Sequence, residues 1–180
     1  MGRIWLPLLA CAGLLVAGCG ETTVEGSPTT TERPTTVAFN PCSDLPDDAL
    51  RAAGLDPATK KTSVDTPTGG GTWKICFWRP VDKTPYAVSI GTTTFTQDDL
   101  PGNPTITGLS DVQIGSRAGK TYRQANSPLM LRCYVSMPSG GGMANVIVDW
   151  DASERETAPE KPPCSLAVEQ ATELEPFLPN

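Results

Sequence analysis

The 180-residue sequence contains no histidine. Histidine is the commonest general base, the commonest metal ligand in proteins and the usual side chain that changes charge near neutral pH. Its absence excludes Ser-His-Asp and Cys-His catalytic sites. Aromatic residues are also scarce, at 6% of the chain, which leaves little material to line a large lipid cavity.

Basic residues and long apolar runs are few as well. The chain has 14 basic and 20 acidic residues, a net charge of −6, and no basic stripe. This balance argues against nucleic acid and against adhesion to anionic lipid headgroups. The one extended apolar run, residues 4–16, contains Pro7 and is too short to cross the ~30 Å hydrocarbon core. We therefore expect no transmembrane helix.

The N-terminus is typical of an exported lipoprotein. A positive start with Arg3 precedes the apolar run, which ends in Leu15-Val16-Ala17-Gly18-Cys19. This pattern predicts a signal peptide over residues 1–18 and a lipobox in which the Cys19 thiol receives diacylglycerol. The alternative is an ordinary secretory signal that happens to contain a cysteine. With a palmitate-type chain on the new amino group as well, two or more chains hold the protein permanently at the extracytoplasmic face of the cell membrane.

The segment after Cys19 is predicted to be a disordered tether over residues 19–40. Residues 20–40 contain seven threonines and two prolines and hardly any large apolar residue. Such a composition cannot bury enough surface to offset the entropy of ordering. The expected r.m.s. reach is about 25 Å. The threonines are either O-glycosylated or bare, and both alternatives stay open.

Residues 41–180 are long enough for a single extracytoplasmic domain. Loss of residues 1–18 removes one positive charge, Arg3, which leaves 13 basic and 20 acidic residues and a net charge of −7. Helix start and stop signals predict a short helix over residues 45–54 and a C-terminal helix over residues 163–175. Glycine- and proline-rich or charged segments predict loops over residues 56–71, 98–108 and 151–161.

Alternating apolar residues predict the strands between these elements. The expected strands cover residues 72–79, 86–95, 112–122 (one or two strands, broken at Gly115 or Gly119), 129–137 and 143–150. The last two strands are expected to form a hairpin around the glycines at 140–142. The expected fold class is α+β, an antiparallel sheet of about five strands flanked on one face by a short N-terminal helix and a C-terminal helix.

Four cysteines remain once Cys11 and Cys19 are assigned to the signal peptide and the lipid. An even number in an exported domain predicts two disulfides among Cys42, Cys76, Cys133 and Cys164. Sequential pairing closes loops of 34 and 31 residues, and the nested pairing of Cys42 with Cys164 and Cys76 with Cys133 is also geometrically credible. A zinc site is disfavoured because no two cysteines have a C-x₂₋₄-C spacing.

The combination of motifs resembles a known group of proteins. It includes the lipobox, the Thr/Pro tether, Pro41-Cys42, Cys76-Phe77-Trp78 and a late helix ending in Phe177-Leu178-Pro179. In this combination the chain resembles the small surface lipoproteins of mycobacteria and related actinobacteria labelled Lpp, Lpq or Lpr, whose domain has no known function. The resemblance implies location and fold, and it favours the sequential disulfide pairing because shorter relatives keep cysteines like the first two only.

Paired carboxylates are the nearest approach to catalytic chemistry in the chain. They occur at Asp98-Asp99, Asp149/Asp151 and Glu154/Glu156, and glycosidases use two such groups. Apart from Asp149, at the end of the predicted strand 143–150, they lie in predicted polar loops, where solvated charges are the simpler interpretation. Asp149, Asp151 and Glu154 do not match an EF-hand spacing. We therefore predict no catalytic, cofactor-binding or metal-binding residue.

Three functions are weighed on this basis. The first is a non-enzymatic interaction or accessory module of the cell envelope. The second is a binding protein or carrier for a lipid or glycan in a groove between sheet and helices, lined by members of the set Trp73, Trp78 and Trp150. An enzyme ranks third, because it requires buried carboxylates with raised pKa values. The expected partners are the membrane, through Cys19, and an envelope protein, lipid or glycan.

Overall fold

The computed structural model describes residues 36–65, 72–126, 131–156, 158 and 160–180. These residues belong to one compact unit, Glu32–Asn180. The predicted signal peptide, Cys19 and residues 19–35 of the predicted tether lie outside the described residues. Within the described part of the chain, no helix has the length and apolar character needed to cross a membrane.

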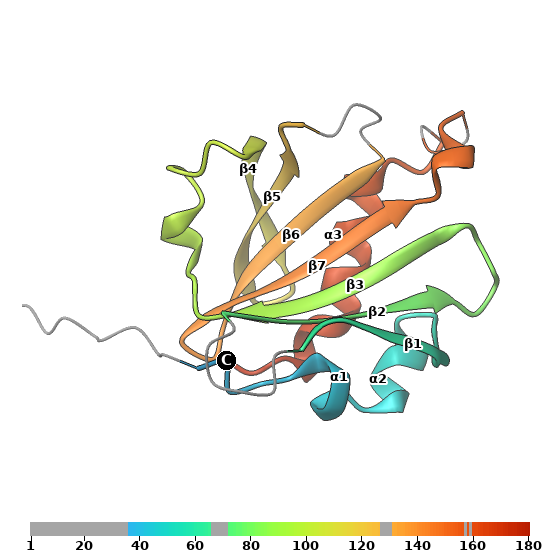
Figure 1. The fold of residues 1–180 in the computed structure, drawn as a ribbon, viewed down its shortest axis with the longest axis horizontal. Helices are drawn as coiled ribbons and strands as arrows, with labels where there is room; N and C mark the ends of the chain where they lie inside the picture. Colours follow the sequence, from blue (N-terminus) through green and yellow to red (C-terminus); the bar gives the residue numbers. More distant parts are fainter. Residues whose placement is uncertain (1–35, 66–71, 127–130, 157, 159) are drawn as a thin grey trace, which may run out of the picture. The chain divides into compact units, whose positions relative to one another are not determined.

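The domain is built on one antiparallel sheet of seven strands in the order β1-β2-β3-β7-β6-β5-β4 (Figure 1). The strands are β1 Leu55–Asp65, β2 Trp73–Pro80, β3 Tyr86–Thr93, β4 Ile106–Ile114, β5 Arg117–Gln124, β6 Arg132–Ser139 and β7 Gly142–Trp150. The antiparallel sheet is confirmed. The expected count of about five strands was wrong, and the domain is mostly β.

Two meanders form the sheet. The first contains β1, β2 and β3, and the second contains β4 to β7. They join where β3 pairs with β7 in an unbroken register from Tyr86↔Trp150 to Thr93↔Met143. The connection from β3 to β4 carries a short 3-10 helix, η1 (Gln97–Asp99), and must pass from the middle of the sheet to its far edge.

The two edge strands account for the difference in strand count. β1 occupies most of the segment predicted as the loop 56–71 and consists largely of polar residues. Its pairing with β2 has two register shifts. Apolar residues do not alternate along its sequence. β4 begins inside the predicted connection 98–108, and a turn at Gly115, with φ of +53°, separates it from β5. Backbone hydrogen bonds rather than buried side chains define both edges.

Three helices lie on one face of the sheet (Figure 1). They are α1 Pro41–Asp44, α2 Asp47–Ala52 and α3 Pro163–Leu174, which continues into the 3-10 helix η3 (Glu175–Phe177). α3 packs on β6 and β7, α1 on β2 and α2 on β1. Both predicted helices are confirmed with shifted bounds. The predicted charged loop 151–161 contains the short 3-10 helix η2 (Ala152–Glu154).

The main core lies between the sheet and these helices. In one row across the strands, Cys76, Ile90, Val146 and Val135 are fully buried and face one another in register. Ala167, Ala171 and Leu174 of α3 are equally buried at helical spacing, which fits a helix stripe turned to a sheet. We call this side of the sheet the covered face.

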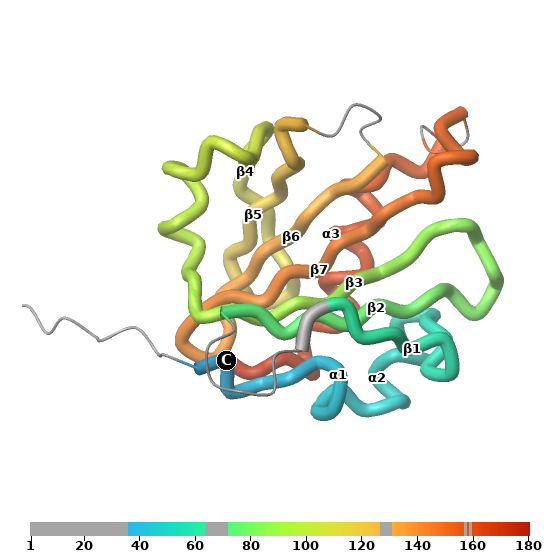
Figure 2. Tube along the Cα trace, viewed as in Figure 1, coloured from blue at the N-terminus to red at the C-terminus, as the bar shows by residue number. Residues whose placement is uncertain are grey.

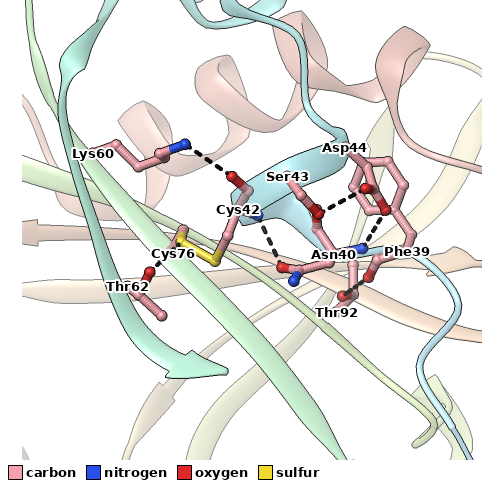
Figure 3. Close-up of a disulfide and its surroundings, with 9 residues drawn as sticks. All are labelled: Phe39, Asn40, Cys42, Ser43, Asp44, Lys60, Thr62, Cys76 and Thr92. Carbon is pink, nitrogen blue, oxygen red and sulfur yellow. Dashed lines mark hydrogen bonds between the residues drawn. A yellow bond between two sulfur atoms is a disulfide. The ribbon is translucent and has the colours of Figure 1, made fainter. Parts of the chain in front are cut away.

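Two disulfides staple the helices to the covered face, Cys42–Cys76 and Cys133–Cys164. This is the sequential pairing. Around the first disulfide, Asn40 Oδ1 accepts a hydrogen bond of 3.0 Å from the Cys42 N–H, and Lys60 Nζ donates to the Cys42 carbonyl at 3.0 Å (Figure 3). Phe39, in the segment predicted as tether, packs on the core, and its carbonyl accepts from Thr92 Oγ1 at 2.7 Å.

The C-terminus is held on the same side by Arg117. Its Nε lies 3.0 Å from Glu175 Oε1, and its guanidinium donates to the carbonyls of Pro179 and Leu178, each at 2.7 Å. Gly140 N–H donates to the Asn180 carbonyl at 3.1 Å, so the chain end lies against the turn between β6 and β7. Figure 2 shows the C-terminus beside the start of the described chain. We call this set of bonds the Arg117 clamp.

Candidate functional site: the open-face groove

The face of the sheet opposite the helices is only partly covered. Because side chains alternate along a strand, the neighbours of the core residues point to this open face. The connection between β3 and β4 covers one end of it, where Leu100, Tyr122 and Met143 form a second small buried cluster. Gln97 of η1 donates to the Ser136 carbonyl at 3.0 Å and fixes this connection against β6. The remaining part of the face is a groove.

The groove has a volume of about 470 Å³ and draws on every strand of the sheet. This size lies within the ~300–1,000 Å³ range of ligand pockets. Six of its lining residues are aliphatic or aromatic: Trp73, Ile75, Ile106, Tyr122, Tyr134 and Ile147. We call this hollow the open-face groove.

Polar side chains outnumber apolar ones along the open-face groove. The eight polar lining residues are Ser63, Ser89, Asn103, Thr105, Gln124, Arg132, Asn145 and Asp149. Arg132 and Asp149 are the two charged members of the lining. The groove therefore combines flat apolar surfaces with hydrogen-bonding groups and carries no net charge.

Arg132 and Asp149 form an ion pair across β6 and β7. They are direct cross-strand partners, and Arg132 Nη2 donates to Asp149 Oδ2. Hydrogen bonding to Asp149 raises the pKa of Arg132, and the nearby Tyr134 side chain adds to this rise against the opposing effect of burial. Both side chains are more than one-third exposed. The hydrogen bond therefore fixes the orientation of the two side chains, and part of their surface is still available to a ligand.

Tyr122 and Tyr134 stack in the wall of the groove, with ring centroids 5.0 Å apart and an angle of 12° between the planes. Tyr122 is the buried member, and Tyr134 is partly exposed. Burial raises the pKa of Tyr122, Tyr134 adds to the rise, and the Asn145 amide opposes it. The Tyr122 phenol therefore stays protonated at neutral pH.

Asn145 lies in the floor of the groove. Its register partners are Gly91 of β3 and Ser136 of β6, so small residues flank it on both sides. The residue is only 1% exposed, and its Oδ1 atom has no hydrogen-bond partner within the described chain. A buried acceptor without a donor costs about 1–3 kcal/mol. The floor therefore contains a polar atom that a donor from the groove would satisfy.

The predicted carboxylate pairs do not come together as a catalytic or metal site. Asp149 pairs with Arg132, whereas Asp151 pairs with Arg79 at 2.9 Å outside the groove. Asp99 Oδ2 accepts from the Thr96 N–H at 2.8 Å and caps η1. Among the described residues there is no cluster of three or more carboxylate or cysteine side chains that could hold a metal ion.

The three tryptophans singled out in the sequence divide between the two faces. Trp73 lines the open-face groove, and its ring lies over Gly91, where an added Cβ would be 3.5 Å from Trp73 Cε3. Trp78 and Trp150 are buried in the core under the helices. One of the three is therefore available to a ligand.

Sequence reasoning missed most of the groove residues. The alternation over residues 129–137 placed Arg132 and Tyr134 together on one face of a strand, so these two residues could have been predicted to share a site. The pairing of Arg132 with Asp149 follows from the register of the hairpin between β6 and β7. The stacking of Tyr122 on Tyr134 needs the pairing of β5 with β6, which no local pattern encodes.

Comparison with known proteins adds a family but no function. No curated protein and no solved structure matches the chain. One family model, described as a protein of unknown function (DUF3558), matches residues 14–176. Since this match spans most of the sequence, the chain belongs to the DUF3558 family.

Proposed function

We propose that the protein is a non-enzymatic binding module of the cell envelope, anchored to the outer face of the cell membrane by a lipid on Cys19. In this proposal the domain is an accessory or interaction protein, and its ligand occupies the open-face groove. The observation that carries the proposal is the groove itself, in which an ion pair, a stacked tyrosine pair and an unpartnered buried amide oxygen converge.

The anchor is supported by the sequence before the domain. Residues 15–19 match a lipobox, and Thr- and Pro-rich residues follow them. The region matched by the family model begins at residue 14 and so includes Cys19. Together with two disulfides, which persist in oxidising compartments, these features favour an exported lipoprotein of the actinobacterial type.

The chemistry of the groove favours binding over catalysis. A general base must be free to accept a proton near neutral pH. The Asp149 carboxylate is hydrogen-bonded to a guanidinium, and the raised pKa of Tyr122 keeps its phenol protonated, so no phenolate is available as a base. These groups can donate and accept hydrogen bonds without transferring protons, which is what a binding site requires.

A second hollow, of about 500 Å³, lies beside α2 and α3 at the edge of the helix layer. It is the nearest counterpart of the groove expected between sheet and helices. Its charged residues, Asp82, Lys161, Glu169 and Glu173, are all exposed, as ordinary solvated charges are. This hollow is also lined by the buried Gln170, whose Oε1 has no hydrogen-bond partner within the described chain. The open-face groove adds a paired arginine and aspartate and a stacked tyrosine pair to such an oxygen, so we assign the ligand to that groove.

Native mass spectrometry of the full chain extracted from its own envelope tests the proposal. We expect a reproducible non-covalent adduct on the wild-type protein and its loss from Tyr134→Ala, which removes the partly exposed ring of the stacked pair. Phe177→Ala is the matched control, because Phe177 is a surface aromatic residue that lies outside the groove. An adduct retained by Tyr134→Ala, or no adduct on the wild type, would contradict the proposal.

A further inference from the structure

We infer that the ligand of the open-face groove is a neutral glycan, with one sugar ring against Tyr134 and its hydroxyl groups bonded to the Arg132–Asp149 pair and to the floor at Asn145. The inference rests on the proposed function and names the chemical class of its ligand. Four features of the groove support it, namely its charge balance, its paired donor and acceptor, its aromatic wall and its unpartnered amide oxygen.

The charge balance favours a neutral ligand. Arg132 and Asp149 neutralise each other, and the other twelve lining residues are uncharged. A phosphate or carboxylate ligand would have to compete with Asp149 for the guanidinium and would leave that carboxylate without its partner. The Asp149 carboxylate would also repel an anion bound beside it, so the guanidinium offers an anion little net attraction here.

The ion pair offers a donor and an acceptor side by side. Arginine donates through five N–H groups and accepts none, whereas an ionised carboxylate only accepts. A hydroxyl group does both, so two neighbouring hydroxyls of a sugar can accept from Arg132 and donate to Asp149 without separating the pair. Both side chains keep more than a third of their surface exposed for such contacts.

The tyrosine pair supplies a flat, preorganised wall. Tyr134 is fixed by stacking on the buried Tyr122, so it loses little freedom when a ligand binds. The face of an aromatic ring is electron-rich and attracts the weakly positive C–H groups of a sugar ring. A sugar can thus place its C–H face on the aromatic wall and its hydroxyl edge on the ion pair at the same time.

The floor needs a hydrogen-bond donor. Asn145 Oδ1 is buried without a partner within the described chain, and most such atoms in proteins bind protein groups or ordered water. A sugar hydroxyl, or a water molecule that it holds in place, would supply this donor. A hydrocarbon chain could not, and it would also cover eight polar lining residues.

A peptide strand fits the groove less well than a sugar. Peptides that extend a sheet bind along an unpaired edge, where backbone groups are free. The groove lies on a face of the sheet, and its floor strands β3, β7 and β6 are paired on both sides. A lipid and a peptide are accordingly the alternatives that the test must separate from a glycan.

The test is a titration of the full chain, extracted in a detergent without a sugar headgroup. The probes are neutral gluco-, manno-, galacto- and arabino-oligosaccharides, with an anionic oligosaccharide, neutral phosphatidylcholine vesicles and an uncharged peptide as comparators. We expect at least one neutral oligosaccharide to bind. Arg132→Gln should weaken that binding by about tenfold or more because it removes a charged hydrogen bond. Tyr134→Ala should weaken it by a similar factor because it removes the ring on which the sugar lies.

Arg79→Gln is the matched control, because it breaks a similarly exposed ion pair with Asp151 outside the groove. It should leave oligosaccharide affinity unchanged. Unaltered affinity in Arg132→Gln and Tyr134→Ala would overturn the inference by placing the sugar elsewhere. Circular dichroism of each variant checks that the fold is retained.

The outcomes separate the inference from the proposed function. If no sugar binds but the envelope adduct is still lost from Tyr134→Ala, the glycan inference fails and the binding groove stands. If the vesicles or the peptide bind in a way that depends on Arg132 and Tyr134, the ligand class is corrected. If neither sugar nor adduct is detected, both the inference and the proposed function fail.

Discussion

Arg117 and Arg132 form ion pairs on opposite sides of the same sheet, and the two pairs differ mainly in exposure. The side chains of Arg117 and Glu175 are 10% and 12% exposed, whereas those of Arg132 and Asp149 are 38% and 36% exposed. Arg117 directs its remaining donors to backbone carbonyls at the chain end. Arg132 faces a groove. An arginine–carboxylate pair thus holds the chain end on the covered face, whereas the pair on the open face is available to a ligand.

The two faces of the sheet have different roles. The covered face holds the apolar core, two disulfides and the Arg117 clamp, and it supplies most of the stability. The open face holds polar groups that are oriented but incompletely satisfied. Changes on the covered face should therefore alter the free energy of unfolding, and changes on the open face should alter binding.

The largest effect is expected from Arg117→Met. It removes the bonds to the C-terminal carbonyls and leaves the Glu175 carboxylate buried without its arginine. Breaking such a pair typically costs about 3–5 kcal/mol of unfolding free energy. Urea unfolding followed by tryptophan fluorescence measures it. Arg51→Met is the control, because the Arg51 pairs with Asp47 and Asp48 are exposed and should contribute less than about 1 kcal/mol.

Loss of the Cys133–Cys164 disulfide should have the next largest effect. The double variant Cys133→Ala/Cys164→Ala opens a loop of 31 residues on the covered face. The chain-entropy relation gives a loss of about 3–4 kcal/mol. The same urea experiment measures it. If the variant matched the wild type, the assignment of stability to the covered face would be wrong.

Arg132→Gln tests the open face, where we expect a change in binding rather than in stability. Because the pair with Asp149 is more than one-third exposed, its removal should change the unfolding free energy by no more than about 1 kcal/mol. Binding of the envelope ligand should nevertheless be weakened by about tenfold or more, whereas Arg79→Gln should leave it unchanged. A loss of stability as large as that of Arg117→Met would show that Arg132 is a structural residue.

A smaller effect is expected at high pH. Burial raises the pKa of Tyr122, so the folded chain keeps this proton where the unfolded chain begins to lose it, above about pH 10. The contribution of Tyr122 to the unfolding free energy should therefore be constant below that pH and should fall as the pH rises further. Tyr122→Phe should flatten the fall. The raised pKa of Tyr86 leaves a residual slope in that variant.

The parts of the fold that were predictable from sequence are those with a strong local pattern. Alternation identified the inner strands β2, β3, β6 and β7, and helix signals identified α2 and α3. Apart from Leu55 and Ile114, the side chains described in the edge strands β1 and β4 are partly or fully exposed, so the sequences of these strands resemble loops. Pairing with a neighbour, which depends on the whole topology, makes them strands.

The groove was harder to predict than the fold for a related reason. Its residues are spread from Ser63 to Asp149 and meet only when the two meanders join at β3 and β7. The sequence-based alternative placed a ligand between the sheet and the helices. Trp78 and Trp150 occupy that space as core residues, and the open-face groove forms on the opposite face.

Hydroxyl-radical footprinting of the full chain tests directly whether a ligand occupies the open-face groove. It compares protein as extracted from its own envelope with protein stripped of bound material by denaturant and refolded with its disulfides intact. We expect Trp73 and Tyr134 to be protected in the extracted protein alone, and Val81 and Phe177, exposed outside the groove, to be oxidised equally in both samples. Equal oxidation of Trp73 and Tyr134 in the two samples, or protection confined to Val81 and Phe177, would contradict this expectation.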